Sequence, residues 1–246
     1  MEPIWNERVL KHKDTLVIAD LHIGYERELA EKGINIPEQS QKMIENVYKL
    51  LEREKTERLV INGDFKHNIP KTTWQEYEDI PKAVDEWLKV VEEIHLVPGN
   101  HDGGIDRYLP SDVKMHDSSG VVIDDIGFFH GHARPAEKVL ETGKVVIGHC
   151  HPSVTLRDSL DNKEKKECWV RMDFSHEERE GEAVIIPHLN HLLGGISINE
   201  DGYLGPFFSD VEISQERIYL LDGTYLGRKT AFTKFTPDNR SYQKRP

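Results

Sequence analysis

The sequence has no apolar run of about 18 residues or more, the length that a membrane-spanning helix needs. Its first residues also lack a basic stretch followed by an apolar one, which predicts a chain without a secretory signal. Cysteine is scarce too, because Cys150 and Cys168 are too few for a disulfide framework. We therefore expect a protein of the reduced cytoplasm without a membrane partner.

Positive charge is in deficit, since 32 Lys and Arg residues stand against 44 Asp and Glu residues, a formal net charge of −12. This argues against a broad basic surface for duplex nucleic acid, where phosphate neutralisation supplies much of the affinity. The exception is the stretch 227–246, a basic C-terminal tail with six basic residues, one acidic residue and a local charge of +5. A solvated, frayed tail is one interpretation, and a contact to nucleic acid is the other. Its basic residues are Arg228, Lys229, Lys234, Arg240, Lys244 and Arg245.

A chain of 246 residues can bury a substantial core, and this one shows no internal repeat, low-complexity tract or linker. We therefore expect a single domain over residues 1–246. In its first part, apolar runs alternate with segments of helical periodicity, which is typical of parallel crossover units. The expected elements are a hairpin over 9–19, helices over 25–32, 37–55 and 72–91, and strands over 58–61 and 93–97.

The expected helix over 72–91 is the segment richest in aromatic residues. Trp74, Tyr77 and Trp87 lie on or near one face of this helix, which predicts packing against a sheet and not a stacking platform for bases. Pro81 predicts a kink or break within the helix.

After residue 113 the pattern changes to closely spaced short strands, which predicts a second sheet. The segment 157–182 is dense in charge and is interpreted as an exposed hairpin or loop. The other expected elements are strands over 120–123, 126–129, 144–147 and 169–172, a helix over 135–142, and a strand over 217–226 with a turn at Asp222-Gly223.

Five polar motifs each follow an apolar strand, at the position where ligand sites form in open α/β sheets. A lone Asp-x-His or Gly-Asp is as often a simple turn, but five such motifs in one chain indicate a shared site. Carboxylate, imidazole and amide groups are the ligands of first-row divalent metals. Residues two apart in an extended chain project to the same side, which predicts that Asp20 and His22 hold one ion, and that His149 and His151 hold one ion. The motifs are Asp20-x-His22, Gly63-Asp64, Gly99-Asn-His-Asp102, His130-Gly131 and Gly148-His-Cys-His151.

In this order the five motifs resemble those of the calcineurin-like metallophosphoesterases, and the resemblance spans residues 16–152. The stretches Gly63-Asp-Phe-Lys-His67 and Ile186-Pro-His-Leu-Asn-His-Leu-Leu-Gly-Gly195 are similar to the SbcD-related or ICC-like subgroup, close to the ligase-associated phosphoesterases. The second stretch departs from the subgroup form Pro-Ala-Phe-Asn-Pro, because it has His188 and His191. The resemblance implies a four-layer αββα sandwich of two mixed β-sheets flanked by helices.

The resemblance also implies a ligand set for two divalent metal ions. Mn²⁺ is favoured, since mixed carboxylate, imidazole and amide ligands suit it, and Fe, Zn, Co, Ni or Mg are alternatives. Asp64 would bridge both ions. The other implied ligands are Asp20, His22 and His151 on one ion and Asn100, His130 and His149 on the other.

Four further polar residues are candidates for catalytic or substrate-binding roles beside the ions. His101, next to the ligand Asn100, would protonate the departing alkoxide or phenoxide, and Asp102 would either orient that imidazole or stabilise the turn. The motif pattern of the family that the chain resembles favours His130 as the metal ligand, with His132 contacting phosphate, although either ring could face the site. His67 would reach the substrate or cap its loop.

The resemblance implies a binuclear metal-dependent phosphoric ester hydrolase in which a metal-bridging hydroxide attacks phosphorus directly. A phosphodiesterase acting on nucleic-acid ends or nucleotide diesters is the favoured hypothesis. The alternatives are a phosphomonoesterase and a catalytically silent scaffold, although all seven ligand positions and His101 have competent residue types. The expected partner is a phosphate ester, such as a nucleotide or a single-stranded nucleic acid, and a homo-oligomer remains open.

Overall fold

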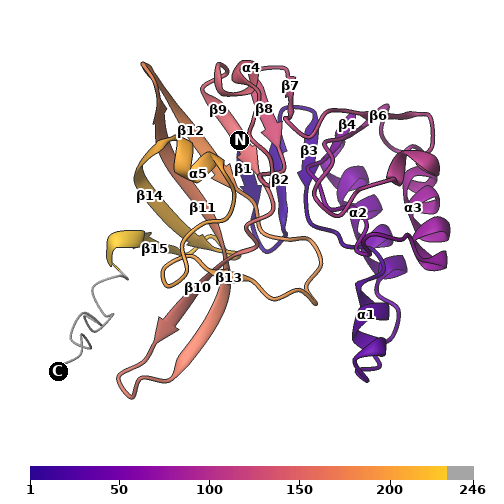
Figure 1. Ribbon diagram of the computed structural model, residues 1–246, viewed down its shortest axis with the longest axis horizontal. Helices are drawn as coiled ribbons and strands as arrows, with labels where there is room; N and C mark the ends of the chain where they lie inside the picture. Colours follow the sequence, from indigo (N-terminus) through magenta and orange to yellow (C-terminus); the bar gives the residue numbers. More distant parts are fainter. Residues whose placement is uncertain (232–246) are drawn as a thin grey trace, which may run out of the picture.

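Two β-sheets packed face to face form the centre of the computed structural model, which describes residues 1–231 (Figure 1). The expected tail over 227–246 therefore lies largely outside the described residues. No helix within residues 1–231 has the length and apolar character needed to cross a membrane.

The first sheet has six strands in sequence order, antiparallel from β1 to β3 and parallel from β3 to β6. The alternation of strand and helix predicted from the sequence is confirmed here. The short strands β1 and β6 were not among the expected elements, because their residues form no clear apolar run. The elements are β1 (Glu2–Ile4), β2 (Val9–His12), β3 (Thr15–Ile18), α1 (Tyr25–Glu31), α2 (Ser40–Glu54), β4 (Arg58–Ile61), α3 (Trp74–Trp87), β5 (Glu93–Leu96), η1 (Ile105–Arg107) and β6 (Val113–Met115).

The second sheet has nine strands, of which β8, β9 and β12 are parallel neighbours. The charged segment 157–182 belongs to it: β10, β11 and β12 form successive antiparallel hairpins whose charges project outward. The elements are β7 (Val121–Ile123), β8 (Ile126–Phe129), α4 (Glu137–Leu140), β9 (Lys144–Ile147), β10 (Pro152–Arg157), β11 (Lys163–His176), β12 (Arg179–Ile185), β13 (Ile196–Ser197), α5 (Phe207–Asp210), β14 (Glu212–Leu220), β15 (Tyr225–Arg228) and η2 (Lys229–Ala231).

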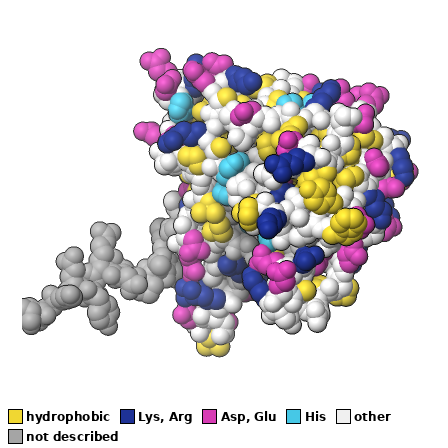
Figure 2. Space-filling model, turned by 45° about the vertical axis from the view of Figure 1, so that its right-hand side comes forward, with side chains coloured by type: hydrophobic (Ala, Val, Ile, Leu, Met, Phe, Trp, Pro, Cys, Tyr) yellow, Lys and Arg dark blue, Asp and Glu magenta, His cyan; other side chains and the backbone are white. Residues whose placement is uncertain are grey.

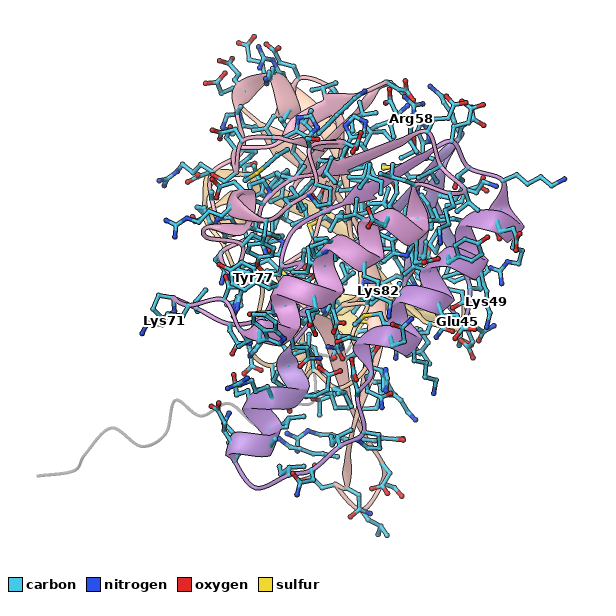
Figure 3. All side chains as sticks on the ribbon, turned by 90° about the vertical axis from the view of Figure 1, so that its right-hand side faces the viewer. Glu45, Lys49, Arg58, Lys71, Tyr77 and Lys82 are labelled. Carbon is cyan, nitrogen blue, oxygen red and sulfur yellow. The ribbon has the colours of Figure 1, made fainter. Side chains whose placement is uncertain are left out.

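Three buried clusters of apolar side chains define the layers. One lies between the sheets and combines Val17 and Val60 of the first sheet with Phe128 and Val184 of the second. A second lies between the first sheet and helices α2 and α3, which run side by side across its outer face (Figures 1 and 3). The third covers the outer face of the second sheet, where α4 and α5 supply a thin helical layer. This is the αββα sandwich that the family resemblance implies.

Helix α3 differs from the prediction at its N-terminal end. Trp87 is fully buried, but Trp74 is 73% exposed and Tyr77 is 44% exposed. The ring of Tyr77 lies 4.5 Å from that of Tyr108, not against the sheet. The prediction of a buried aromatic face is therefore wrong for the first turns of the helix, and the helix continues through Pro81 without a break.

Candidate metal centre

The polar motifs converge where the carboxyl ends of strands from both sheets meet. Asp20 and Asp64 follow β3 and β4 of the first sheet, whereas His130 and His149 follow β8 and β9 of the second. Hydrogen bonds hold these loops together: Asp20 N donates to the backbone oxygen of Gly63 at 3.0 Å, and His149 N donates to the side-chain Oδ2 of Asp20 at 3.1 Å. The two sheets therefore share one site, which neither could build alone.

The first cluster consists of Asp20, His22 and His151, whose ligand atoms lie within 4.8 Å of one another. His151 Nε2 is 3.1 Å from Asp20 Oδ1. Asp20 is fully buried, and His22 is 3% exposed. A carboxylate and two imidazoles at this separation form a ligand set that suits a divalent cation.

The second cluster consists of Asp64, His130 and His149, again within 4.8 Å of one another. Asp64 Oδ2 is 3.3 Å from His130 Nε2 and 3.4 Å from His22 Nε2, so this one oxygen faces both clusters. The structure thus brings together six of the seven predicted ligands, in the two sets that the resemblance implies.

The local backbone of these residues is not extended. Five of the predicted ligands have positive φ angles, a conformation that is uncommon for residues other than glycine. Strand alternation therefore does not explain the clusters. Asp20 and His22 do belong to one cluster, as predicted, whereas the prediction for His149 and His151 is wrong, because they belong to different clusters. The five residues are Asp20 (φ 56°), His22 (43°), Asp64 (51°), His149 (63°) and His151 (41°).

Two glycines of the motifs are required by close approach. A Cβ atom on Gly99 would overlap with Asp64 Oδ1, and one on Gly63 would overlap with the ring of His130. Gly63 also has a φ of 91°, which a side chain would strain. These glycines allow the ligand loops to pack against one another.

The tautomer of His130 fits a metal ligand. Its Nδ1 lies 2.8 Å from the carbonyl oxygen of Asn62, which can only accept, so the neutral ring has its proton on Nδ1 and its lone pair on Nε2. Nε2 of His130 and Nε2 of His22 are buried without a hydrogen-bond partner among the described residues. Ring nitrogens held this way by a carbonyl are typical of metal-binding histidines.

The charges of the site also fit a cation. Burial lowers the pKa of His130, but the neighbouring carboxylates of Asp64 and Asp20 outweigh it and raise that pKa to about 9. Burial lowers the pKa of His22 to about 3 and that of His149 to about 4, which keeps both rings neutral. Burial lowers the pKa of His151 as well, but the carboxylate of Asp20 outweighs this and raises that pKa. Two neutral and two positively charged imidazoles thus face the two buried carboxylates, and a bound divalent ion would supply the positive charge in place of the protons on His130 and His151.

His67 lies beside the first cluster, in a third group with His22 and His101. Its Nδ1 is 3.1 Å from His22 Nδ1, and its Nε2 is 2.6 Å from Glu28 Oε2 on helix α1. Both ring nitrogens therefore have protein partners. This arrangement differs from the predicted substrate contact of His67, which would need a free ring nitrogen.

His101 and Asp102 are held in different ways. His101 Nδ1 donates to the carbonyl oxygen of His67, which leaves Nε2 of the ring for another group. Asp102 is buried and accepts from Phe65 N at 2.9 Å, Lys66 N at 3.2 Å and Gly99 N at 2.8 Å. Burial, followed by the charge of Asp64, raises the pKa of Asp102 to about 6. These contacts agree with the turn-stabilising alternative for Asp102 and include no bond to the His101 ring.

Asn100 and His132 are less tightly placed. Asn100 is exposed, and its side chain makes no hydrogen bond within residues 1–231. The ring of His132 lies 5.4 Å from that of His130 and 6.2 Å from that of His149, with its Nδ1 buried and unpaired among the described residues. His132 therefore borders the second cluster.

Cys150 stands between His149 and His151 in the sequence, but its side chain packs in the apolar core of the second sheet. Burial raises the pKa of its thiol to about 12, and its Sγ donates to Leu204 O. The packing interpretation of this residue agrees with the structure.

Sequence reasoning did not assign four polar residues that support the site. Glu28 and Glu76 lie on helices, where a glutamate carries no distinguishing signal. Asn62 stands directly before Gly63, and no motif distinguishes its side chain. The ring of His188 lies 5.0 Å from that of His151. Its departure from the subgroup pattern is the one sequence feature that distinguishes it.

Comparisons with known proteins show the family of the chain. A family model described as calcineurin-like phosphoesterase matches residues 14–211. Among solved structures, the nuclease MPE of Pseudomonas putida has a TM-score of 0.52 and 22% sequence identity, covering 87% of this chain and 88% of that one. YfcE, a phosphoesterase from E. coli, has a TM-score of 0.41 and 17% identity, covering 87% and 96%. No curated protein matches the chain.

The matched range contains every strand end that contributes to the two clusters, together with strands β3 to β13 of the two sheets. The predicted superfamily is confirmed, and the chain belongs to the calcineurin-like phosphoesterase family.

Proposed function

We propose that the protein is a binuclear metal-dependent phosphodiesterase acting on nucleotide diesters or the ends of single-stranded nucleic acid. The observation that supports two ions is the position of Asp64 Oδ2, 3.4 Å from His22 Nε2 and 3.3 Å from His130 Nε2. A carboxylate shared in this way suits two ions about 3.5–4 Å apart.

One ion would be held by the first cluster and the other by the second, with Asp64 shared. When bound, the ions would supply Lewis acidity, offset the charge of the phosphate and generate a nucleophile from water at neutral pH. Mn²⁺ remains the proposed ion because the ligands mix carboxylate and imidazole. Asn100 stands between Gly99 and His101, which both lie against Asp64, and it is the proposed further ligand of the second ion.

His101 is the proposed general acid. Its backbone N–H donates to Asp64 Oδ1 at 2.9 Å, and its Nδ1 is fixed on the carbonyl of His67. Both anchors position the ring, so Nε2 can deliver a proton to the leaving oxygen of the ester. His132, half-buried beside the second cluster, is the proposed contact to a phosphate oxygen.

The preference for nucleotide substrates is supported by the exposed rings at the start of α3. Glu76 of this helix accepts from the backbone N–H groups of His67 and Asn68, which ties the helix end to the loop of the site. Tyr77 and Lys71 lie on the same side of this region in Figure 3, and Figure 2 shows apolar side chains gathered beside Lys and Arg on the helix-bearing side. Aromatic rings stack on bases with about 1–3 kcal/mol per base.

The test compares bis(p-nitrophenyl) phosphate with p-nitrophenyl phosphate after adding Mn²⁺ or Mg²⁺ to the metal-free protein. Faster turnover of the diester is expected. Faster turnover of the monoester would favour the phosphomonoesterase, and no turnover of either would favour the silent scaffold.

The nucleotide preference needs a separate comparison. Thymidine 5′-(p-nitrophenyl phosphate) presents a base, whereas bis(p-nitrophenyl) phosphate does not. Trp74→Ala should lower kcat/KM for the thymidine ester by about tenfold and leave the other diester nearly unchanged. Equal changes for both substrates would remove the support for base recognition at this surface.

A further inference from the structure

A chain of three side chains leads from helix α1 to the first metal cluster. Glu28 Oε2 lies 2.6 Å from His67 Nε2, and His67 Nδ1 lies 3.1 Å from His22 Nδ1. The other ring nitrogen of His22, Nε2, is buried, has no hydrogen-bond partner among the described residues and faces Asp64 Oδ2 at 3.4 Å.

The direction of each hydrogen bond follows from the first one. An ionised carboxylate can only accept, so His67 must carry its proton on Nε2. A neutral imidazole has one donor and one acceptor, so His67 Nδ1 accepts and His22 Nδ1 donates. The proton of His22 is therefore on Nδ1, and the lone pair of Nε2 points at the metal cluster. The opposite tautomer would place an N–H group there and could not bind a cation.

We propose that Glu28 is a positioning residue that acts through His67 to fix the metal-binding tautomer of His22. The inference rests on the proposed function only in taking His22 as a metal ligand. It makes the exposed helix α1 part of the metal site although none of its side chains belongs to the metal clusters.

The fold around His67 allows this role to be tested without unfolding the loop. The backbone N–H of His67 is held by Ile23 O at 3.0 Å and Glu76 Oε1 at 2.9 Å, and its carbonyl accepts from His101. These anchors do not involve Glu28, whose side chain is 35% exposed. Truncating Glu28 should therefore free the His67 ring and leave its backbone in place.

The protein also contains two matched controls. Glu31 lies on the same helix, is 70% exposed at its side chain and pairs only with the surface residue Arg27. Glu93, His95 and His116 form a second carboxylate–histidine–histidine chain, with distances of 3.1 and 2.9 Å, at the edge of the first sheet. Removing Glu31 or Glu93 changes the net charge by the same amount as removing Glu28.

The first experiment measures Mn²⁺ affinity of the full chain by isothermal titration calorimetry. Residues that orient metal ligands from outside typically contribute about 10–100-fold in affinity. We expect Glu28→Ala to weaken one of the two binding steps by about tenfold or more, and Glu31→Ala and Glu93→Ala to stay within about twofold of the original protein. An affinity of Glu28→Ala equal to that of the controls would overturn the inference and leave the proposed function standing.

A conservative pair at His67 separates the hydrogen bond from the space that the ring fills. His67→Gln keeps an acceptor oxygen for His22 Nδ1–H, whereas His67→Leu removes it. We expect the glutamine variant to retain most of the Mn²⁺ affinity that the leucine variant loses. Equal losses of Mn²⁺ affinity in the two variants would mean that the His67 ring only fills space, and would overturn the proposed connection from Glu28 through His67 to His22.

The second experiment reads the tautomer in the metal-free protein by ¹⁵N NMR of the histidine rings. His22 should be found with its proton on Nδ1 and should become a mixture of tautomers in Glu28→Ala. A mixture already present in the original protein would contradict the inference. This result does not depend on metal binding or activity, so a failure of the proposed function remains distinguishable.

Discussion

Glu76 is expected to hold the loop of the metal site in place. Its side chain is fully buried, and Oε1 accepts from His67 N at 2.9 Å and from Asn68 N at 2.7 Å. Oε2 accepts from Thr73 N at 2.6 Å and from the Thr73 hydroxyl at 2.9 Å, which completes a capping box at the start of α3. One carboxylate thus joins the helix to the residues that contact His22 and His101.

Glu76→Gln keeps the shape of this side chain but leaves only one acceptor oxygen. The amide is expected to place its oxygen towards His67 and Asn68, because two backbone donors and the Asn68 side chain meet there. The NH₂ group then faces the N–H of Thr73, and two donors oppose each other. An unpaired buried donor costs about 1–3 kcal/mol. We therefore expect the free energy of unfolding to fall by about 2 kcal/mol.

Urea denaturation of the metal-free protein measures this loss as a lower midpoint at an unchanged slope. Glu78→Gln is the control, since Glu78 is exposed on the same helix and the substitution removes the same charge. The two variants would have equal midpoints if the carboxylate of Glu76 did not hold the loop, and that result would refute the reasoning. Mn²⁺ affinity should also fall in Glu76→Gln, because the loop positions His67.

Three further predictions follow from the geometry of the described residues. Gly99→Ala should weaken Mn²⁺ binding by about tenfold or more, because the added methyl group overlaps with Asp64 Oδ1. Gly103→Ala is the control, since its added methyl group has nothing within 4 Å. Equal Mn²⁺ affinities of the two variants in calorimetry would contradict the close approach of Gly99 to Asp64. His101→Ala should slow the release of an alkoxide by about 10²-fold or more and that of p-nitrophenoxide far less, and equal losses in kcat would count against the general acid. Burial lowers the pKa of His95 and of His116, so the folded protein favours their neutral forms. The two neutral rings therefore stabilise the folded protein fully above about pH 6.5, and this stabilisation is lost as the pH falls. His95→Gln should therefore show a smaller drop in denaturation midpoint between about pH 7 and pH 5 than the original protein, and an identical drop would refute this assignment.

Much of the site was predictable because its residue types cluster at strand ends. Asp20, Asp64 and His130 each follow a run of apolar residues, and the carboxyl ends of parallel strands meet at one edge. The backbone conformation of these residues was not predictable from the motifs. Left-handed φ angles at Asp20 and His22 depend on the packing of both sheets, which a local pattern does not record.

The fold was predictable where helices and strands are strongly periodic, and not where tertiary position decides burial. Trp87 and Trp74 both lie in α3 and have similar intrinsic properties, yet one is fully buried and the other is 73% exposed. Trp87 packs in the apolar cluster between the helices and the first sheet, whereas Trp74 does not belong to that cluster. Glu28 was missed for the same reason, since its partner His67 is 39 residues away in the sequence.

Asn62 explains why the metal centre lies at the junction of the sheets. Its buried side chain donates to Phe129 O and Val146 O, both at 3.1 Å, while its own carbonyl accepts from His130 Nδ1. The end of β4 is thereby locked to β8 and β9, and the tautomer of a metal ligand is set by the same residue. A left-handed conformation at a residue other than glycine costs about 1–3 kcal/mol and persists only where the surrounding structure enforces it. Five predicted ligands have that conformation, so the site requires the rigid contact between two sheets that Asn62 provides.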